Sequence, residues 1–151
     1  MKTNSRICYD AGMRLYLSSY RNGSALKLLG NSRRTAYINN ALDFLPQDER
    51  EQSVADGIGR LKNIGLEPAE VDLRGYFGKS AELKEKLADF DLIWVRGGNV
   101  FLLRRAFKQS GADKVIAELL QKDQVAYGGS SAGAVILCPS FRGIDLVDDP
   151  S

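Results

Sequence analysis

Short apolar runs alternate along the chain with longer stretches in which apolar residues recur every three or four positions. The short runs predict strands, and the stretches with the helical period predict helices. The predicted strands are 14–20, 35–41, 69–75, 91–98 and 124–129. The predicted helices are 24–30, 49–66, 80–90, 99–109, 112–122 and a last one that begins at 132.

The segment 49–66 shows the helical pattern most clearly. Its apolar residues follow one another at spacings of four, three and three, which places on one helix face Val54, Ile58, Leu61 and Ile64. Gly65 stands where a C-terminal cap is expected. Strands separated by such helices favour right-handed crossovers and a mostly parallel sheet with helices on both faces. The predicted fold class is therefore α/β.

Composition fits one domain with a single core. The chain has 151 residues, of which 44% are hydrophobic and 26% charged, and its formal net charge is +2. Basic and acidic residues are interspersed, and no apolar run approaches the ~18 residues of a membrane span. We therefore expect no nucleic acid and no membrane as partners. Residues 1–12 lack the apolar segment of a secretory signal and are interpreted as a poorly ordered leader before a single domain at 13–151.

The two cysteines, Cys8 and Cys138, are too few for a disulfide framework. Cys8 lies in the leader, and Cys138 lies in an apolar stretch where we expect a small buried hydrophobic residue. A reduced, cytoplasmic setting is the simplest interpretation.

Two predicted strands end in glycine-rich turns, at 96–99 and 128–133. In a parallel sheet, function gathers at the carboxyl ends of the strands. No G-x-G-x-x-G follows the first strand, and no G-x-x-x-x-G-K-[ST] occurs anywhere in the sequence. Nucleotide binding therefore has weak support. The second turn fits G-x-S-x-G, with Ser131 at its centre and Ser130 as the lesser candidate. That pattern exposes a nucleophilic serine on a sharp turn between strand and helix.

Backbone donors in the same two turns suit the negative charge that a serine nucleophile creates. The N–H of Ala132 follows the serine at a helix N-terminus, and Gly97 or Gly98 offers a second N–H from the neighbouring turn. The alternative interpretations are structural. Ser131 is then a helix N-cap, and the turn at 96–99 is a tight turn with Asn99 as the N-cap of the next helix.

The segments LIWVRGGNVFLL and VAYGGSSAGAVIL, about two dozen residues apart, resemble the peptidase E family of α-aspartyl dipeptidases, to which cyanophycinase is related. The resemblance extends from about residue 13 over most of the chain. It implies a cytoplasmic serine peptidase that needs no metal or cofactor and cleaves short peptides after an N-terminal aspartate. The implied fold is a flavodoxin-like or class I glutamine amidotransferase-like three-layer sandwich.

Individual residues match the family's motifs. Ser131 matches the nucleophile, and Gly98 and Ala132 match the two oxyanion-hole donors. Gly97 and Asn99 are the implied substrate-binding residues. The family's acidic residue is matched by Asp148, two positions before Pro150, with Asp149 as the alternative.

One departure from the family is large. The family's base is a histidine in a later P-H-Y-like motif, and this sequence contains no histidine. The resemblance therefore implies a domain that is incomplete at its C-terminus, and a 151-residue chain that alone is nearly inactive. Three hypotheses follow: a serine peptidase of short Asp-containing peptides, a non-catalytic remnant or binding module, and a cyanophycinase-like hydrolase with a different acidic substrate. The sequence is also compatible with assembly into a homo-oligomer.

Overall fold

The computed structural model describes residues 6–10 (backbone only), 13–18, 31 and 33–138. Within these ranges, six strands form one sheet in the order β1-β2-β6-β5-β3-β4. The strands are β1 (Arg6–Asp10), β2 (Met13–Ser18), β3 (Arg34–Ile38), β4 (Glu67–Glu70), β5 (Leu92–Val95) and β6 (Ala126–Ser130). The pairs from β2 to β4 are all parallel, which confirms the mostly parallel sheet.

Strand β1 is the one antiparallel member, and it pairs with β2. It lies inside the segment 1–12 that the sequence analysis interprets as a leader. Arg6 pairs with Leu17 and Asp10 with Met13, so the chain reverses between two adjacent strands. The backbone groups of β1 are thereby hydrogen-bonded along the β2 edge, which a search for apolar runs did not reveal.

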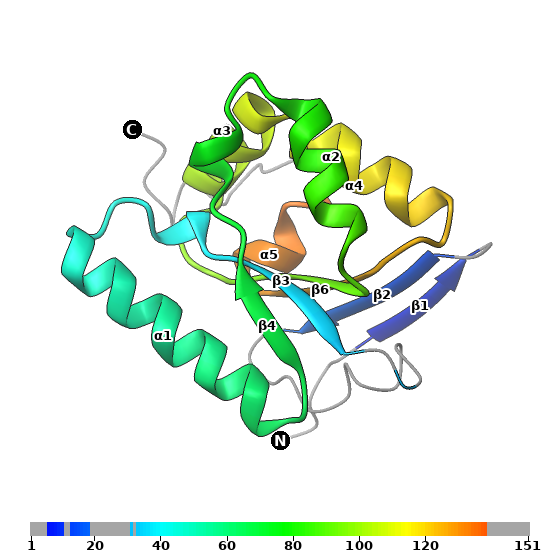
Figure 1. The fold of residues 1–151 in the computed structure, drawn as a ribbon, viewed down its shortest axis with the longest axis horizontal. Coiled ribbons are helices and arrows are strands. Elements are labelled where there is room, and N and C mark those ends of the chain that lie inside the picture. The colour runs from blue at the N-terminus through cyan, green and yellow to red at the C-terminus, as the bar shows by residue number, and fades with distance from the viewer. Residues whose placement is uncertain (1–5, 11–12, 19–30, 32, 139–151) are drawn as a thin grey trace.

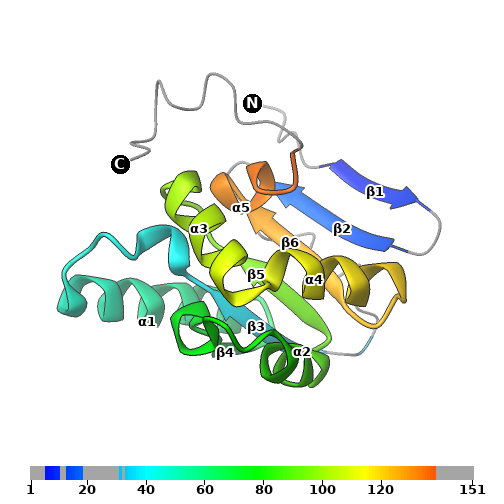
Figure 2. The ribbon, with the colours of Figure 1, turned by 90° about the horizontal axis from the view of Figure 1, so that it is seen from above.

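Helices cover both faces of the sheet, as Figures 1 and 2 show. One face carries α1 (Gln47–Asn63), and the other carries α2 (Ser80–Ala88), α3 (Val100–Ser110) and α4 (Ala112–Gln121). A short helix, α5 (Ala132–Val135), follows β6. Two 3-10 helices, η2 (Asn40–Leu42) and η3 (Leu73–Tyr76), follow β3 and β4. The three-layer α/β sandwich is confirmed.

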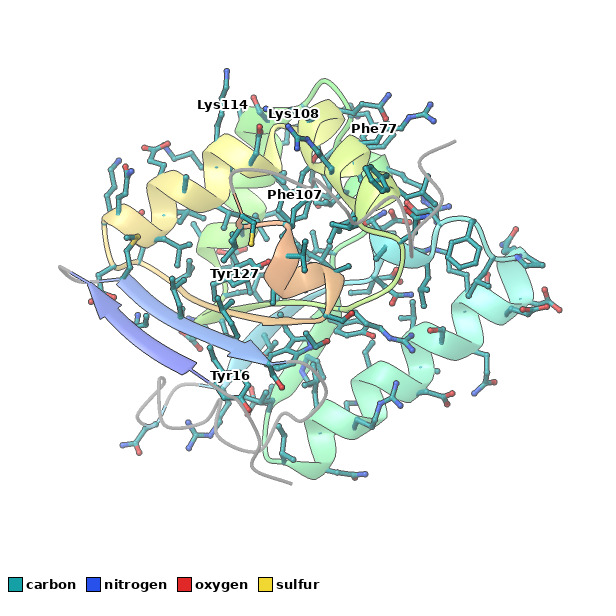
Figure 3. All side chains as sticks on the ribbon, turned by 180° about the vertical axis from the view of Figure 1, so that it is seen from behind. Tyr16, Phe77, Phe107, Lys108, Lys114 and Tyr127 are labelled. Atoms are coloured by element: carbon teal, nitrogen blue, oxygen red, sulfur yellow. The ribbon has the colours of Figure 1, made fainter. Side chains whose placement is uncertain are left out.

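Each face of the sheet has its own apolar core. Tyr16 and Trp94 point toward α1, with their ring centroids 6.0 Å apart. Tyr127 and Phe107 belong to the larger core beneath α2, α3 and α4. Figure 3 shows Tyr16 and Tyr127 on opposite sides of the strands. The sheet is therefore buried on both faces, as a parallel sheet requires.

Three predicted elements differ from the structure or lie outside it. The predicted strand 35–41 is β3 at 34–38, and its last two residues belong to η2. The predicted strand 69–75 is instead β4 at 67–70, followed by the turn of η3, because the Asp72 side chain accepts a hydrogen bond from the Arg74 N–H and starts that turn. The predicted helix 24–30 lies outside the described residues. Gly65 follows α1 with a φ of 89°, as a C-terminal cap requires.

Strand β4 forms one edge of the sheet. It pairs with β3 only, with Pro68 opposite Thr35. Its side chains are mostly exposed, including those of Glu67 and Glu70. The carboxyl ends of β2 to β6 point to the same end of the sheet, where the two glycine-rich turns lie.

Among the described helices, none combines the length and the apolar character needed to cross a membrane.

Candidate active site

Ser131 lies at a sharp turn between β6 and α5. Its φ and ψ are 51° and −114°, and it is one of two described non-glycine residues with a positive φ. Such a backbone costs of order 1–3 kcal/mol and persists where the surroundings enforce it. The Ser131 N–H donates to the carbonyl of Ser18 at 3.0 Å, and the residue is exposed. This is the geometry that the G-x-S-x-G pattern predicts.

The glycines on both sides of Ser131 fill positions where no side chain fits. A Cβ on Gly129 would lie 2.3 Å from the carbonyl oxygen of Gly133. A Cβ on Gly133 would lie 2.1 Å from the carbonyl oxygen of Val95. The buried Tyr127 hydroxyl donates to the same Gly133 carbonyl at 2.5 Å. Backbone therefore packs directly on backbone around the serine, and the turn has little freedom to relax.

The turn at Gly97 and Gly98 lies directly beside this serine. A Cβ on Gly97 would lie 2.8 Å from the Ser131 Cβ and 3.4 Å from its Oγ. Gly98 has a φ of 152°, and a Cβ there would lie 2.6 Å from the carbonyl oxygen of Ala41. The structure thus brings together the two turns that the sequence analysis places at one end of the sheet.

Unpaired backbone donors flank the serine. Within the ranges described, the N–H groups of Gly98 and Ala132 have no hydrogen-bond partner. Both turns are solvent-accessible, because Gly98 is half-buried and Ser131 is exposed. An unpaired N–H beside an accessible serine is available to bind an anionic oxygen.

Asn99 begins the next helix. Its side-chain Oδ1 accepts hydrogen bonds from the N–H groups of Phe101 and Leu102, at 2.9 and 3.1 Å. Its own N–H donates to the Ala41 carbonyl at 2.8 Å. The side chain therefore caps α3, which is the structural role that the sequence analysis offers as an alternative.

A base for Ser131 is missing from this arrangement. Its Oγ makes no hydrogen bond to any residue that the structure describes. The two candidate acidic partners, Asp148 and Asp149, lie outside the described residues. Across 6–10, 13–18, 31 and 33–138, no group of three or more His, Cys, Asp or Glu residues is placed to hold a metal ion.

Sequence reasoning did not identify the polar residues at the carboxyl ends of β3 and β5. Arg96, directly before Gly97, is half-buried, and its guanidinium donates to the side chain of Ser53 and to Asn39 Oδ1. Arg96 also lines an open hollow of about 600 Å³ with residues of α1: Asp48, Glu49, Gln52, Ser53 and Asp56. Polar residues directly after a buried strand, as in INN at 38–40 and RGG at 96–98, are the sequence signal that could have found them.

The side chain of Asn39 is fully buried in this region. Its Oδ1 also accepts from the Tyr37 hydroxyl at 3.4 Å, whereas its Nδ2 has no partner among the described residues. Burial raises the pKa of Tyr37 above the ordinary tyrosine value, and the nearby Arg96 charge partly offsets this. Tyr37 is therefore a neutral hydrogen-bond donor at physiological pH.

Cys138 is exposed, so the expectation of a buried residue is wrong. It lies just beyond α5 and lines a groove of about 410 Å³ together with Phe107, Ile116 and Ile136. Helix α5 ends at Val135, and the residues that follow it become exposed at Leu137 and Cys138.

Comparison with known proteins places this chain in a family. The model of peptidase family S51 matches residues 20–151. An uncharacterized peptidase of Listeria monocytogenes is 38% identical over 95 residues, which are 63% of this chain and 45% of that protein. An uncharacterized peptidase of Pasteurella multocida is 29% identical over 114 residues, which are 73% of this chain and 54% of that protein. The chain spans about half the length of these curated relatives.

Solved structures agree on the fold. A crystal structure described as a peptidase E protein from Listeria monocytogenes superposes with a TM-score of 0.70 at 28% identity, over 98% of this chain and 68% of that one. A peptidase from an acI-B1 actinobacterium superposes with a TM-score of 0.65 at 19% identity, over 85% and 58% of the two chains, and supports the fold alone. With the family model covering most of the sequence, this chain belongs to peptidase family S51, as the resemblance to peptidase E predicts.

Proposed function

We propose that this chain carries the nucleophile and oxyanion hole of a serine peptidase. The observation that carries the proposal is the strained, exposed Ser131 against the Gly97–Gly98 turn. Ser131 Oγ attacks the peptide carbonyl, and the N–H groups of Gly98 and Ala132 stabilise the oxyanion that forms. A single oxyanion donor of this kind is worth about 10²–10³ in rate.

The reaction proceeds through an acyl-enzyme. The Oγ–carbon bond forms, the peptide C–N bond breaks, and the proton of the serine hydroxyl passes through a base to the leaving amine. Water then cleaves the ester and regenerates Ser131. The sequence has no histidine to act as this base, and a carboxylate with an ordinary pKa near ~4 is a poor substitute. Asp148 is the proposed acidic partner of a base supplied from outside these residues.

The proposed substrate is a short peptide with an N-terminal aspartate. The hollow lined by Arg96 and α1 supports it, because it combines the guanidinium of Arg96 with the carboxylates of Asp48, Glu49 and Asp56. An N-terminal aspartate carries one ammonium and one side-chain carboxylate, which complement these two kinds of charge. Arg96, which lines the hollow, directly precedes Gly97 in the sequence, and any side chain at Gly97 would meet the serine.

A second candidate is a non-catalytic binding module of the same fold. The observation in its favour is the lack of histidine in the sequence. A cyanophycinase-like hydrolase with another acidic substrate keeps the same serine and oxyanion turns. It differs from the first candidate only in the group that the hollow accepts.

Hydrolysis assays separate these functions. The 151-residue chain and the full-length gene product are each assayed on Asp-X dipeptides, on Ala-X dipeptides and on a β-linked aspartyl peptide. We expect nearly no turnover by the 151-residue chain and turnover of Asp-X by a gene product that continues into a Pro-His motif. Ser131→Ala abolishes it, whereas the matched Ser130→Ala leaves most of it.

Three results would redirect the proposal. A gene that stops at Ser151 with no activity favours the binding module. Cleavage of the β-linked peptide alone favours the cyanophycinase-like enzyme. Ordinary turnover by the 151-residue chain that Ser131→Ala removes would require a base that differs from the family's histidine.

A further inference from the structure

We infer that Arg50 is a positioning residue that holds the Gly98 N–H in place through η2 and the Ala41 carbonyl. The inference rests on the proposed function for the role of that N–H, and on contacts in the structure for everything else. Arg50 lies on α1 and does not belong to either of the motifs that indicate a peptidase.

Arg50 is a buried arginine surrounded by carboxylates. Only 6% of the residue is exposed, and its guanidinium lies 2.9 Å from Asp43, 3.0 Å from Glu70 and 3.4 Å from Asp72. Arg74 adds a second cation, 2.7 Å from Asp72. Hydrogen bonds from Arg74 and Asn40 outweigh the opposing effect of burial and hold the pKa of Asp72 at about 2, so this carboxylate is charged at neutral pH.

This cluster fixes the two ends of η2. Asp43 is the residue that follows η2, and it accepts hydrogen bonds from Arg50 Nε and from Asn40 Nδ2, at 2.9 and 2.8 Å. Asn40 begins η2, and its Nδ2 also donates to Asp72 at 3.0 Å. Its Oδ1 accepts from the Leu73 N–H at 3.1 Å. All polar atoms of the Asn40 side chain are therefore occupied in holding this one turn.

The middle residue of η2 contacts the proposed oxyanion turn. The Ala41 carbonyl accepts the Asn99 N–H at 2.8 Å, and the same oxygen closes the space over Gly98. Ser130 and Ser131 close the space over Gly97 from the other side. The peptide between Gly97 and Asn99 is thus held between the serine turn and η2, and η2 is held by Arg50.

A purely stabilising role explains this arrangement less well. Buried ion pairs contribute little net stability compared with apolar residues of similar volume. What they supply is fixed geometry, because the arginine fork directs several hydrogen bonds at once. A displacement of about 1 Å is enough to weaken the hydrogen bond from an oxyanion donor. A turn that is held in place therefore favours catalysis in a way that added stability alone does not.

Amide hydrogen exchange in the 151-residue chain tests the positioning directly. In Arg50→Met we expect the Asn99 amide to exchange about tenfold faster, while the Trp94 amide in β5 changes less than about twofold. Asp43→Asn, which removes one charge and keeps the arginine, gives the same pattern more weakly and remains informative if Arg50→Met does not fold. Arg50→Lys restores part of the protection. Arg34→Met, which breaks the exposed pair with Asp91 at the other end of the sheet, changes neither amide.

Kinetics of the full-length gene product test the consequence for catalysis. Arg50→Met is expected to lower kcat about tenfold with a KM change below about twofold, because the oxyanion forms only in the transition state. Unchanged Asn99 exchange in folded Arg50→Met and Asp43→Asn, or equal acceleration at Trp94, would overturn the inference. Faster Asn99 exchange with unchanged kcat would overturn its catalytic part. A wild type insensitive to Ser131→Ala would instead refute the proposed function, and the exchange result would still decide whether Arg50 holds the turn.

Discussion

The two glycine-rich turns that meet at Ser131 use positive φ angles in opposite ways. At the first turn the unusual conformation falls on a glycine, Gly98, with a φ of 152°. At the second it falls on a residue with a side chain, Ser131, with a φ of 51°, and the glycines stand on either side of it. The first turn therefore avoids conformational strain, whereas the second retains it.

The difference corresponds to what each turn presents. The first turn presents a backbone N–H, so it needs no side chain. Glycines also allow Ala41 and Ser131 to pack closely against this turn, where a Cβ would clash with them. The second turn presents a hydroxyl, so it must keep a Cβ, and the lack of a side chain at Gly97 leaves room for that Cβ. Of these two turns, only the one whose side chain performs the proposed chemistry places a non-glycine residue at a positive φ.

Gly133→Ala tests the second turn most severely. The added methyl group would lie 2.1 Å from the Val95 carbonyl oxygen, and both groups belong to backbone that is packed on the core. We expect a loss of about 3 kcal/mol in the free energy of unfolding, measured by urea denaturation. Gly59→Ala in α1, where the structure places nothing within 4 Å, is the control and is expected to gain about 0.5–1 kcal/mol. Equal effects of the two changes would contradict the close packing.

Gly98→Ala tests the first turn. The substitution forces an alanine to a φ of 152° and against the Ala41 carbonyl oxygen at 2.6 Å. The expected loss is about 2 kcal/mol in the free energy of unfolding, smaller than for Gly133 because Gly133 is buried whereas Gly98 is half-buried. Gly75→Ala, with open space and no positive φ, serves as the matched control in the same thermal or urea measurement. A neutral Gly98→Ala would remove the contrast between the turns.

Tyr127→Phe removes the side-chain support of the second turn. The Gly133 carbonyl loses its buried donor, and we expect the free energy of unfolding to fall by about 1–2 kcal/mol at neutral pH. Burial also raises the pKa of Tyr127 above its ordinary value. The unfolded chain ionises this tyrosine near ~10 while the folded chain keeps it protonated, so the wild type loses stability as the pH rises past that value. Stability curves measured from neutral to alkaline pH should be flatter in the variant, and parallel curves would contradict the assignment.

Ser131→Gly gives the smallest expected effect, and it is a gain. Glycine adopts a φ of 51° without strain, so the free energy of unfolding should rise by about 0.5–1 kcal/mol after the entropy cost of glycine is subtracted. Ser131→Ala keeps the Cβ and is expected to leave stability almost unchanged. If alanine stabilises the chain as much as glycine does, the hydroxyl and not the backbone is the source of the strain.

The sequence was most informative where periodicity and glycine spacing act locally. The helix α1, the strands β5 and β6 and the sharp turn at Ser131 all follow from short local patterns in the sequence. Strand β1 did not, because its pairing with β2 is a tertiary contact and not a run of apolar residues. The predicted strand 69–75 failed because Asp72 starts a turn there through its own side chain.

Long-range polar contacts explain what the sequence could not reveal about the site. Arg50 and Asp43 are seven residues apart, and each resembles an ordinary charged position on a surface. Only the fold places them with Glu70 and Asp72 around one buried guanidinium. Asn99 shows the converse case, since its capping role is local and was among the alternatives drawn from the sequence.

Strand β4 has a consequence for how this protein behaves at high concentration. An edge strand exposes a row of backbone groups to which a strand of another molecule can add, and fibrils grow in this way. Pro68 removes one donor from that row, and the exposed Glu67 places a negative charge beside it. We therefore expect this edge of the sheet to resist strand addition and the aggregation that follows from it.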